Sequence, residues 1–318
     1  MMNTLNSPLI ILIPVYEDST VFSSLLKELK VQLNTNFFVI AVDDGSLAYP
    51  IDVSLLQENQ LAGEVIKLKR NVGHQRAIAL GVCYIAEHYP NSSVVIMDAD
   101  GEDEPKTIPI LLFQLSQKNK KVVVAVRKKR VASLQFRIFY HLYKLTFYLL
   151  TGKKINFGNY MALKPLAIKR LSAMQELWIH LAGCTLLSKL PIGSIPIQRG
   201  PRIAGESKMN FVALILHGLK ALMVFADDVL ARVGIACAVL ASLSLIIMPI
   251  PLILKSIGIA SPGWSSILFG VCLLIFIQAG TLALITLLLS GLAKQAGLSP
   301  VNYKNMIEEI QNTQRNFS

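Results

Sequence analysis

The chain has 318 residues, of which 53% are hydrophobic and only 16% charged, with a mean hydropathy of +0.51 and a formal net charge of +11. Soluble globular proteins are less apolar, so we expect part of the chain to lie in a lipid bilayer. The same numbers exclude a disordered or a disulfide-rich secreted protein. The four cysteines form no C-x-x-C pair, so they indicate neither a zinc site nor a disulfide framework.

The charge is unevenly divided along the chain. Residues 1–105 contain 6 basic and 14 acidic side chains, whereas residues 106–226 contain 20 basic and 2 acidic ones. The acidic block suits a metal ion, and the basic block, which adjoins apolar segments, suits phosphates or an anionic membrane surface. Nucleic acid is the competing partner for the basic block. We expect none, because the block has no recognisable nucleic-acid-binding motif.

Short β-branched runs alternate with helical patterns through the first 130 residues, which predicts an α/β fold with a mostly parallel sheet between helices. The expected strands are residues 9–15, 37–42, 64–68, 93–97 and 121–126. The first run has no basic region before it, which favours a buried strand over a signal peptide. Polar loops follow three strands, at Tyr16–Asp18, Asp43–Ser46 and Asp98–Asp100. Ligands bind at the carboxyl ends of such strands, so we expect these loops to converge on one crevice.

Two apolar, aromatic helical patterns come next, at residues 133–150 and 211–225. Tyrosines together with Arg137 and Lys144 are typical of an amphipathic helix in the headgroup layer of a bilayer. Burial of both helices in a globular domain is the alternative, because helical periodicity does not separate the two cases.

Two charge-free segments follow, residues 233–254 and 265–292, and each is long enough to cross a bilayer. The short connection between them predicts a transmembrane hairpin with both ends on one side. Pro249 and Pro251 predict a kink in the first span. Basic residues accumulate on the side of the large domain, so the positive-inside rule places that domain and both termini in the cytosol, with the hairpin in the inner membrane.

The most specific local pattern is Asp98-Ala99-Asp100 at the end of the fourth expected strand. Two carboxylates at positions i and i+2 can turn toward one hard cation, and Mg2+ or Mn2+ held in this way takes one or two carboxylates together with substrate phosphates. A solvated acidic turn before the helix that starts near Pro105 is the alternative, although Glu102 and Asp103 suffice as helix-start residues. We expect the metal at Asp100, with Asp98 beside it.

Four more motifs accompany this pattern: Pro14-Val15-Tyr16, Asp43-Asp44-Gly45-Ser46, Arg70-Asn71-Val72-Gly73-His74, and the segment from Arg199 to Lys208. These motifs and their order along the chain resemble those of the family 2 glycosyltransferases, whose nucleotide-sugar-binding fold is called GT-A. Within that family the chain is most similar to the polyprenyl-phosphate glycosyltransferases, which include bactoprenol glucosyltransferases and dolichyl-phosphate mannose synthases. The resemblance extends from about residue 8 to residue 292, the hairpin being similar to that of the bactoprenol members.

The resemblance implies four parts: a GT-A core (1–132), an acceptor-side part with interfacial helices (133–226), the two transmembrane helices (227–294) and a cytosolic tail (295–318). The implied donor-binding residues are Pro14, Tyr16, Glu17, Asp43, Asp44, Arg70, Asn71, Gly73, His74 and Asp98, with Asp43 or Asp44 on the uracil. Those implied to hold the acceptor phosphate or the donor diphosphate are Arg199, Arg202, Ser207 and Lys208. Guanidinium groups suit phosphate physically, although attachment to anionic headgroups is the alternative.

One segment departs from the group. Where the group usually has an acidic residue in a G-D-F-R-like segment, this chain has Gly158-Asn159-Tyr160. Asn159 cannot ionise, so a metal-directed charge and a potential base are both absent. The second pKa of a phosphate monoester is about 6, so a lipid phosphate is already anionic near neutral pH and needs no base.

The leading hypothesis is a metal-dependent inverting glycosyltransferase that moves a hexose, by analogy glucose, from a UDP-sugar to undecaprenyl phosphate. Asp98, Asp100, Arg202 and Lys208 would be its catalytic residues. A processive polysaccharide synthase is an alternative, but the nearest match to its Q-x-x-R-W segment, at residues 175–178, lacks the arginine. A non-catalytic membrane scaffold is the other. Homo-oligomers and a separate flippase for the product stay open as partners.

Overall fold

The computed structural model describes residues 8–33, 35–127, 134–198, 200, 218–259, 263–296 and 301–313. The chain divides into two compact units, which are described separately below. The first unit comprises Met1–Ala132, Ile155–Val224 and Pro300–Ser318, and the second comprises Ser133–Lys154 and Phe225–Ser299. The helix expected at residues 133–150 therefore groups with the hairpin rather than with the segment that follows it.

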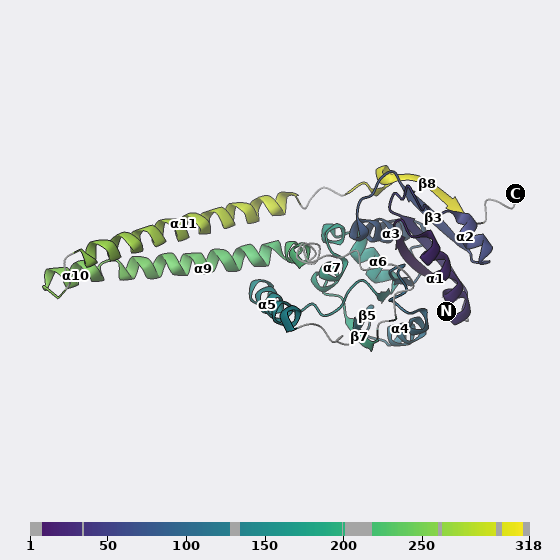
Figure 1. Cartoon of the computed structure of the whole chain (residues 1–318), viewed down its shortest axis with the longest axis horizontal. Helices are drawn as coiled ribbons and strands as arrows, with labels where there is room; N and C mark the ends of the chain where they lie inside the picture. Colours follow the sequence, from purple (N-terminus) through teal and green to yellow (C-terminus); the bar gives the residue numbers. More distant parts are fainter. Residues whose placement is uncertain are drawn as a thin grey trace. The chain divides into compact units, whose positions relative to one another are not determined.

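The first unit is built on one mixed sheet of eight strands in the order β7-β5-β6-β4-β1-β2-β3-β8 (Figure 1). The strands are β1 (Leu9–Val15), β2 (Phe37–Asp43), β3 (Gly63–Leu68), β4 (Val94–Ile96), β5 (Val122–Arg127), β6 (Met161–Leu163), β7 (Ile192–Ile197) and β8 (Ile307–Asn312). Strands β4, β1, β2 and β3 are parallel, and β5 is parallel to β7, whereas β6 and β8 are antiparallel to their neighbours. The α/β architecture expected from the sequence is confirmed. Strands β6, β7 and β8 were not predicted from the sequence.

Helices cover the sheet on both sides, as expected. They are α1 (Ser19–Gln32), α2 (Val53–Glu58), α3 (His74–His88), α4 (Ile108–Ser116), α6 (Pro165–Ser172) and α7 (Leu181–Leu187), with short 3-10 turns η1 (Pro105–Thr107), η2 (Gln175–Trp178) and η3 (Tyr303–Met306). Residues 301–313, expected to be part of a tail, thus contain η3 and β8, and β8 completes one edge of the sheet.

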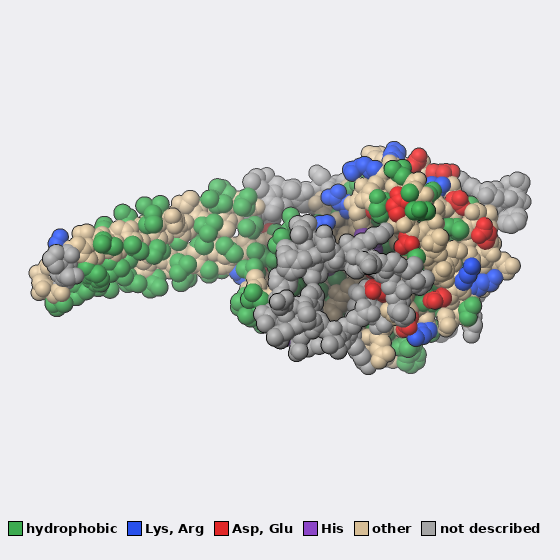
Figure 2. Space-filling model, viewed as in Figure 1, with side chains coloured by type: hydrophobic (Ala, Val, Ile, Leu, Met, Phe, Trp, Pro, Cys, Tyr) green, Lys and Arg blue, Asp and Glu red, His purple; other side chains and the backbone are tan. Residues whose placement is uncertain are grey.

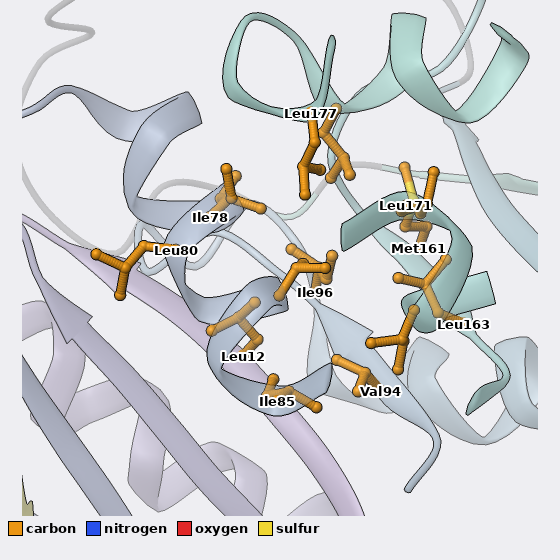
Figure 3. Packing of buried hydrophobic residues seen from close by; sticks show 14 of the residues in the cluster. Leu12, Ile78, Leu80, Ile85, Val94, Ile96, Met161, Leu163, Leu171 and Leu177 are labelled. Carbon is orange, nitrogen blue, oxygen red and sulfur yellow. The ribbon is translucent and has the colours of Figure 1, made fainter. Parts of the chain in front are cut away.

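Two hydrophobic cores lie on the two faces of the sheet. Side chains alternate along a strand, so in β1 Ile10 and Leu12 enter one core while Ile11 and Ile13 enter the other. In the first core Leu12 packs among side chains from α3, β4, β6, α6 and η2 (Figure 3). These residues are fully buried, and each such side chain contributes about 1.5–3 kcal/mol. The packed sheet gives the loops at its carboxyl edge a rigid support.

The second unit contains α5 (Leu134–Thr151), α9 (Ala226–Ile247), α10 (Ile250–Ser256) and α11 (Trp264–Ala296). Two stretches are long and apolar enough to cross a membrane, Ala226–Ser256 and Trp264–Leu289, each with a mean hydropathy of 2.5. Figure 2 shows α9 and α11 covered by hydrophobic side chains on the visible face. Helix α9 ends at Ile247 and α10 begins after Pro249, at the place where the sequence predicts a kink.

Candidate active site

The loop after β1 is tied to the loop after β2 through one carboxylate. The two oxygens of Glu17 accept the backbone N–H groups of residues 47–49 at 2.7 to 3.2 Å, and the N–H of Glu17 donates to Ser46 Oγ at 2.8 Å. These bonds hold Glu17 at φ +50°, which non-glycine residues seldom adopt. The predicted donor-binding residue Glu17 thereby fixes the second loop, next to Tyr16, whose side chain is 44% exposed.

Two further predicted donor residues belong to the strands themselves. Pro14 is buried in β1, beyond Leu12, the last residue of β1 that pairs with β4. Asp43 ends β2, and its carboxylate accepts the N–H of Ser46 at 2.9 Å and that of Ile51 at 3.0 Å. Asp43 therefore closes the turn that leads out of β2.

Asp44 joins the loop after β2 to the loop after β3. Its Oδ1 accepts the N–H of Val72 at 2.7 Å, and its Oδ2 accepts the N–H of Gly73 at 2.9 Å. Burial raises the pKa of this carboxyl and the charge of Asp43 adds to the rise, whereas the two N–H groups and His74 act to lower it. Both oxygens of the side chain are thus engaged by backbone groups, and the predicted uracil contact of Asp43 or Asp44 stays a prediction.

The same two loops pack backbone against backbone at Gly45. A Cβ atom at this position would lie 2.4 Å from the carbonyl carbon of Arg70 and 2.6 Å from the nitrogen of Asn71, and φ is +69°. Only glycine combines this backbone with so close an approach. The side chains of Arg70 and Asn71 are exposed. Gly73 precedes α3 with φ +92°. Because Asp44 binds the N–H groups of Val72 and Gly73 and Gly45 packs on Arg70 and Asn71, the D-D-G-S and R-N-x-G motifs form one structural element.

The loop of residues 98–104, called the acidic loop below, follows β4 and precedes η1. Asp98 donates its N–H to Asp103 Oδ2 at 3.2 Å, and Asp100 Oδ1 accepts the N–H of Glu102 at 3.1 Å. Asp103 is fully buried, whereas the side chain of Asp98 is 22% exposed. The buried end of the loop thus supports two carboxylates, Asp98 and Asp100, that are partly open to solvent.

His74, the first residue of α3, meets this loop. Its Nε2 lies 3.1 Å from Asp98 Oδ1. Desolvation acts to lower the pKa of the imidazole, but the neighbouring charges of Asp98, then Asp44 and Asp100, raise it above its ordinary value. The structure therefore brings the predicted residues His74, Asp98 and Asp44 into one cluster.

Asn159, which stands where the group usually has an acid, lies at the same cluster. Its Nδ2 is 3.0 Å from His74 Nε2, and its Oδ1 accepts a hydrogen bond from Gln75 Nε2 at 3.1 Å. Gln75 was not among the residues predicted from the sequence, although it follows His74 directly. Tyr160 was also missed; its hydroxyl binds Thr107 Oγ1 and donates to the carbonyl of Glu104 at 3.0 Å, which secures the end of the acidic loop.

The predicted phosphate-binding residues Arg199, Arg202, Ser207 and Lys208 lie outside the described residues. One residue of that segment, Gly200, is described. Its N–H donates to the carbonyl oxygen of Glu102 at 3.1 Å, and a Cβ atom there would lie 2.8 Å from Glu104 Cγ and 3.1 Å from the carbonyl oxygen of Gly101. At Gly200, then, the segment is in contact with the acidic loop.

A comparison with known families agrees with this geometry. The sequence profile described as Glycosyl transferase family 2 matches residues 10–178, which is more than half of the chain. The chain belongs to this family. The match includes the strands from β1 to β6, the loops that follow β1, β2, β3 and β4, and Asn159, but it ends before Gly200.

This family 2 glycosyltransferase has a curated relative in Bacillus subtilis strain 168, the uncharacterized glycosyltransferase YkcC. The two are 26% identical over 275 residues, which cover 81% of each chain. Among solved structures, glucosyl-3-phosphoglycerate synthase from Mycobacterium tuberculosis, in complex with Mn2+, UDP and glucosyl-3-phosphoglycerate, aligns with a TM-score of 0.47 and 13% identity over 71% of this chain and 80% of that one. The same synthase with UDP aligns with a TM-score of 0.49 and 11% identity over 70% and 80%.

The donor set of this glycosyltransferase suits a hard divalent cation. Asp98 and Asp100 offer carboxylate oxygens from one loop, and Mg2+ or Mn2+ commonly takes one or two carboxylates and completes its shell with water and substrate phosphates. The described residues contain no group of three His, Cys, Asp or Glu side chains arranged to hold a metal by themselves. Asp98 and Asp100 are thus two carboxylates of the kind that such a cation takes as ligands.

Proposed function

We propose that the protein is an inverting glycosyltransferase that moves a hexose from a UDP-sugar to a polyprenyl phosphate, with undecaprenyl phosphate and glucose as the first acceptor and sugar to test. The observation that supports it most directly is the contact of Gly200 with the acidic loop. Gly200 stands in the sequence between the predicted phosphate-binding residues Arg199 and Arg202, so we infer that a phosphate bound by those residues and a donor bound at the loop of Asp98 and Asp100 would be neighbours.

The acceptor class is inferred from the second unit. Two helices there are long and apolar enough to cross a membrane, so a substrate with a lipid tail would share the bilayer with the enzyme. Helix α5 supports the same acceptor, because Leu142, Leu145 and Leu149 are 55 to 60% exposed and follow helical spacing along one side of it. Phe147 of α5 packs edge-on against Phe225 with ring centres 5.8 Å apart, and Arg232 donates to the carbonyl of Leu149 at 3.2 Å. An interfacial helix attached to the first turns of α9 would have this form.

The proposed reaction is a single displacement at the anomeric carbon. An oxygen of the lipid phosphate forms the new bond to that carbon as the bond to the UDP oxygen breaks, and UDP leaves with both electrons of the broken bond. The configuration inverts, so an α-linked donor gives a β-linked lipid phosphosugar. The phosphate is already ionised near neutral pH, so the displacement requires no base at Asn159.

The protein residues would act by binding and alignment. Glu17 ties the loop after β1 to the loop after β2, and Asp43 closes the turn after β2. Asp44 ties the loop after β2 to the loop after β3. Arg202 and Lys208 are assigned to the phosphates, and Asp98 and Asp100 would hold the metal. When bound, the divalent cation supplies positive charge that stabilises the departing diphosphate. Alignment of two bound anions in this way accounts for a large part of such rate enhancements.

The test is direct transfer. Purified full-length protein in nanodiscs is incubated with undecaprenyl phosphate, Mn2+ or Mg2+ and each of several labelled nucleotide sugars, and lipid products are identified by mass spectrometry. The Asp100→Asn variant keeps an oxygen for the N–H of Glu102 but loses the charge, so we expect product formation to fall at least 100-fold, the order for a lost electrostatic group in catalysis.

The matched control is Glu28→Gln, which removes a charge from an exposed site on α1 and should leave the rate unchanged. A soluble phosphate monoester and a free sugar replace the lipid in two further arms, which separates a lipid acceptor from its chemical relatives. Absence of lipid-linked sugar with every donor would contradict the proposal. Nucleotide binding that needs no metal, without turnover, would favour the scaffold instead.

A further inference from the structure

The C-terminal segment, residues 301–313, meets the loop that carries the R-N-x-G motif, residues 69–73. Strand β8 runs antiparallel to β3, so β8 begins beside the carboxyl end of β3 (Figure 1). Lys69 is the first residue after β3, and its N–H donates to the carbonyl oxygen of Met306 at 3.0 Å. The C-terminal segment therefore contacts the R-N-x-G loop at the point where this loop leaves the sheet.

The pairing of β3 with β8 is irregular at the same point. Lys67 lies opposite Glu309. The next residue, Leu68, lies opposite Ile307, which leaves Glu308 as an extra residue in β8. A bulge of this kind bends and twists the paired strands locally. Together with the hydrogen bond of Lys69 that follows it, the bulge sets the direction in which the chain enters the R-N-x-G loop.

The turn η3 attaches the C-terminal segment to α3, the helix that begins directly after the R-N-x-G loop. Tyr303 is buried in the hydrophobic core that contains Leu68, and Val72 of the loop packs against the same core. The hydroxyl of Tyr303 donates to the carboxylate of Glu87 in α3, which also binds Lys304. The C-terminal segment thus contacts the elements at both ends of the loop, β3 and α3.

The R-N-x-G loop has a second support in the turn after β2. Asp44 accepts the N–H groups of the last two residues of the loop at 2.7 and 2.9 Å, while the C-terminal segment holds the N–H of the first, Lys69. The side chains of Arg70 and Asn71, both predicted to bind the donor, are exposed between these fixed points. A fixed backbone with exposed polar side chains is a preorganised binding surface, which gains affinity because little order is lost on binding.

We propose that Tyr303 and Met306 are positioning residues of the donor site, through which the C-terminal segment holds the R-N-x-G loop in the conformation that binds the nucleotide donor. Neither residue needs to contact the donor, because both act through the backbone of the loop. The segment that follows the two long apolar helices in the chain is in this way a working part of the donor site. The effect on the donor rests on the proposed function, whereas the order of the loop does not.

The first test measures the order of the loop without any ligand. Hydrogen exchange of residues 69–73 is followed by mass spectrometry in the full-length protein in nanodiscs. In Tyr303→Ala we expect exchange at least about 30-fold faster than in the wild type, because truncation of a buried aromatic side chain loosens the turn that carries Met306. In Tyr303→Phe the ring remains and only the bond to Glu87 is lost, so the increase should be about 2- to 12-fold.

Two controls separate a role in the loop from a general loss of stability. Leu29→Ala truncates a fully buried side chain of α1, in the core on the other face of the sheet, and should leave the exchange of residues 69–73 unchanged. Asn312→Ala removes the 2.8 Å hydrogen bond to Glu64 at the far end of β8 and should also leave it unchanged. Wild-type exchange in Tyr303→Ala, or equal acceleration in Leu29→Ala, would overturn the positioning role. If Tyr303→Ala does not fold, Tyr303→Phe decides the question in the same way.

The second test is kinetic, with the donor and acceptor that the wild type uses. We expect Tyr303→Phe to raise the donor KM by about 2- to 12-fold, the worth of one hydrogen bond, and to leave kcat and the acceptor KM nearly unchanged. A merely structural role would lower the amount of active enzyme, and so kcat, without a change in the donor KM. Faster exchange with an unchanged donor KM would overturn the link between loop order and donor binding. A wild type that neither binds a nucleotide nor transfers sugar would overturn the proposed function, and the exchange experiment would still decide whether the C-terminal segment holds the loop.

Discussion

Three carboxylates of the predicted donor site accept hydrogen bonds from backbone N–H groups, either of their own loop or of a neighbouring one. Glu17 accepts from residues 47–49, Asp43 from Ser46 and Ile51, and Asp44 from Val72 and Gly73. Each is therefore a support for loop geometry in addition to any contact with a nucleotide. A substitution at one of them should alter stability and ligand binding together.

Asp44 gives the sharpest prediction at this scale. In Asp44→Ala, the N–H groups of Val72 and Gly73 both lose their acceptor, and we expect the free energy of unfolding to fall by about 2 kcal/mol, the order of cost for unsatisfied donors. Asp44→Asn retains one acceptor oxygen, so its free energy of unfolding should lie between those of Asp44→Ala and the wild type. Thermal unfolding in detergent, followed by circular dichroism, measures the order.

The control for Asp44 is Glu58→Ala, an exposed change on α2 that should leave the unfolding transition in place. UDP binding is measured on the same samples. Equal stability of Asp44→Ala and wild type would show that the link between the two loops does not depend on this carboxylate.

The sequence predicted some residues of the site and not others, for physical reasons. Asp98, Asp100 and Asp44 follow strands, and strand ends converge at one edge of a parallel sheet, so their proximity could be inferred. The partners of Asn159 could not be. His74 is 85 residues away along the chain, and the link depends on how α3 and the segment before β6 pack. From sequence, Asn159 was interpreted only as a missing charge.

At the scale of elements, the C-terminal strand β8 is the main addition to the fold predicted from sequence. The ends of strands β1 to β5 were predicted within one or two residues, because these strands are rich in β-branched residues and are buried on both faces. Strand β8 reads Ile-Glu-Glu-Ile-Gln-Asn and lies at an edge, where polar residues are normal and hydrophobic periodicity is weak. Its place depends on contacts with distant residues, among them Asn312 with Glu64 at 2.8 Å and Gln311 with the N–H of Val53 at 3.0 Å.

Glu87 of α3 secures the turn before β8, and this contact should depend on pH. The hydrogen bond from Lys304, and then that from Tyr303, lower the pKa of Glu87 below its ordinary value of 4.5. A carboxyl whose pKa is lower in the folded state stabilises the fold above its unfolded pKa and ceases to do so as the pH falls through its folded pKa. We therefore expect β8 to be protected at neutral pH and to loosen below about pH 4.5.

Hydrogen exchange of the amides of Ile307–Asn312, corrected for intrinsic rates, measures this effect. Glu87→Gln should exchange faster than wild type at neutral pH and should show less change on acidification. Glu308→Gln, an exposed change on β8 itself, is the matched control. Exchange in Glu87→Gln that equals wild type at neutral pH would contradict the role given to Glu87.

At the scale of the whole molecule, the pairing of β3 with β8 constrains any membrane topology. Residues 307–312 are hydrogen-bonded to a strand near the start of the chain, and Thr313 exchanges hydrogen bonds with Gly63 at 3.1 and 3.2 Å. Strands of one sheet cannot lie on opposite sides of a bilayer. Any crossings of a membrane between Val224 and Pro300 must therefore be even in number, and this part of the chain contains two helices long and apolar enough to cross.

Two crossings predict that the connection between α10 and α11 lies on the opposite side from the sheet. In a variant without its four native cysteines, Ser256→Cys should react with a membrane-impermeant maleimide from outside right-side-out vesicles. Glu309→Cys, on β8, should react only after permeabilisation or in inverted vesicles. The reason is the hydrogen bonding of β8 to β3, which keeps residue 309 with the sheet. If both sites react from the same side, the two helices do not cross the membrane as a hairpin, and the predicted topology is wrong.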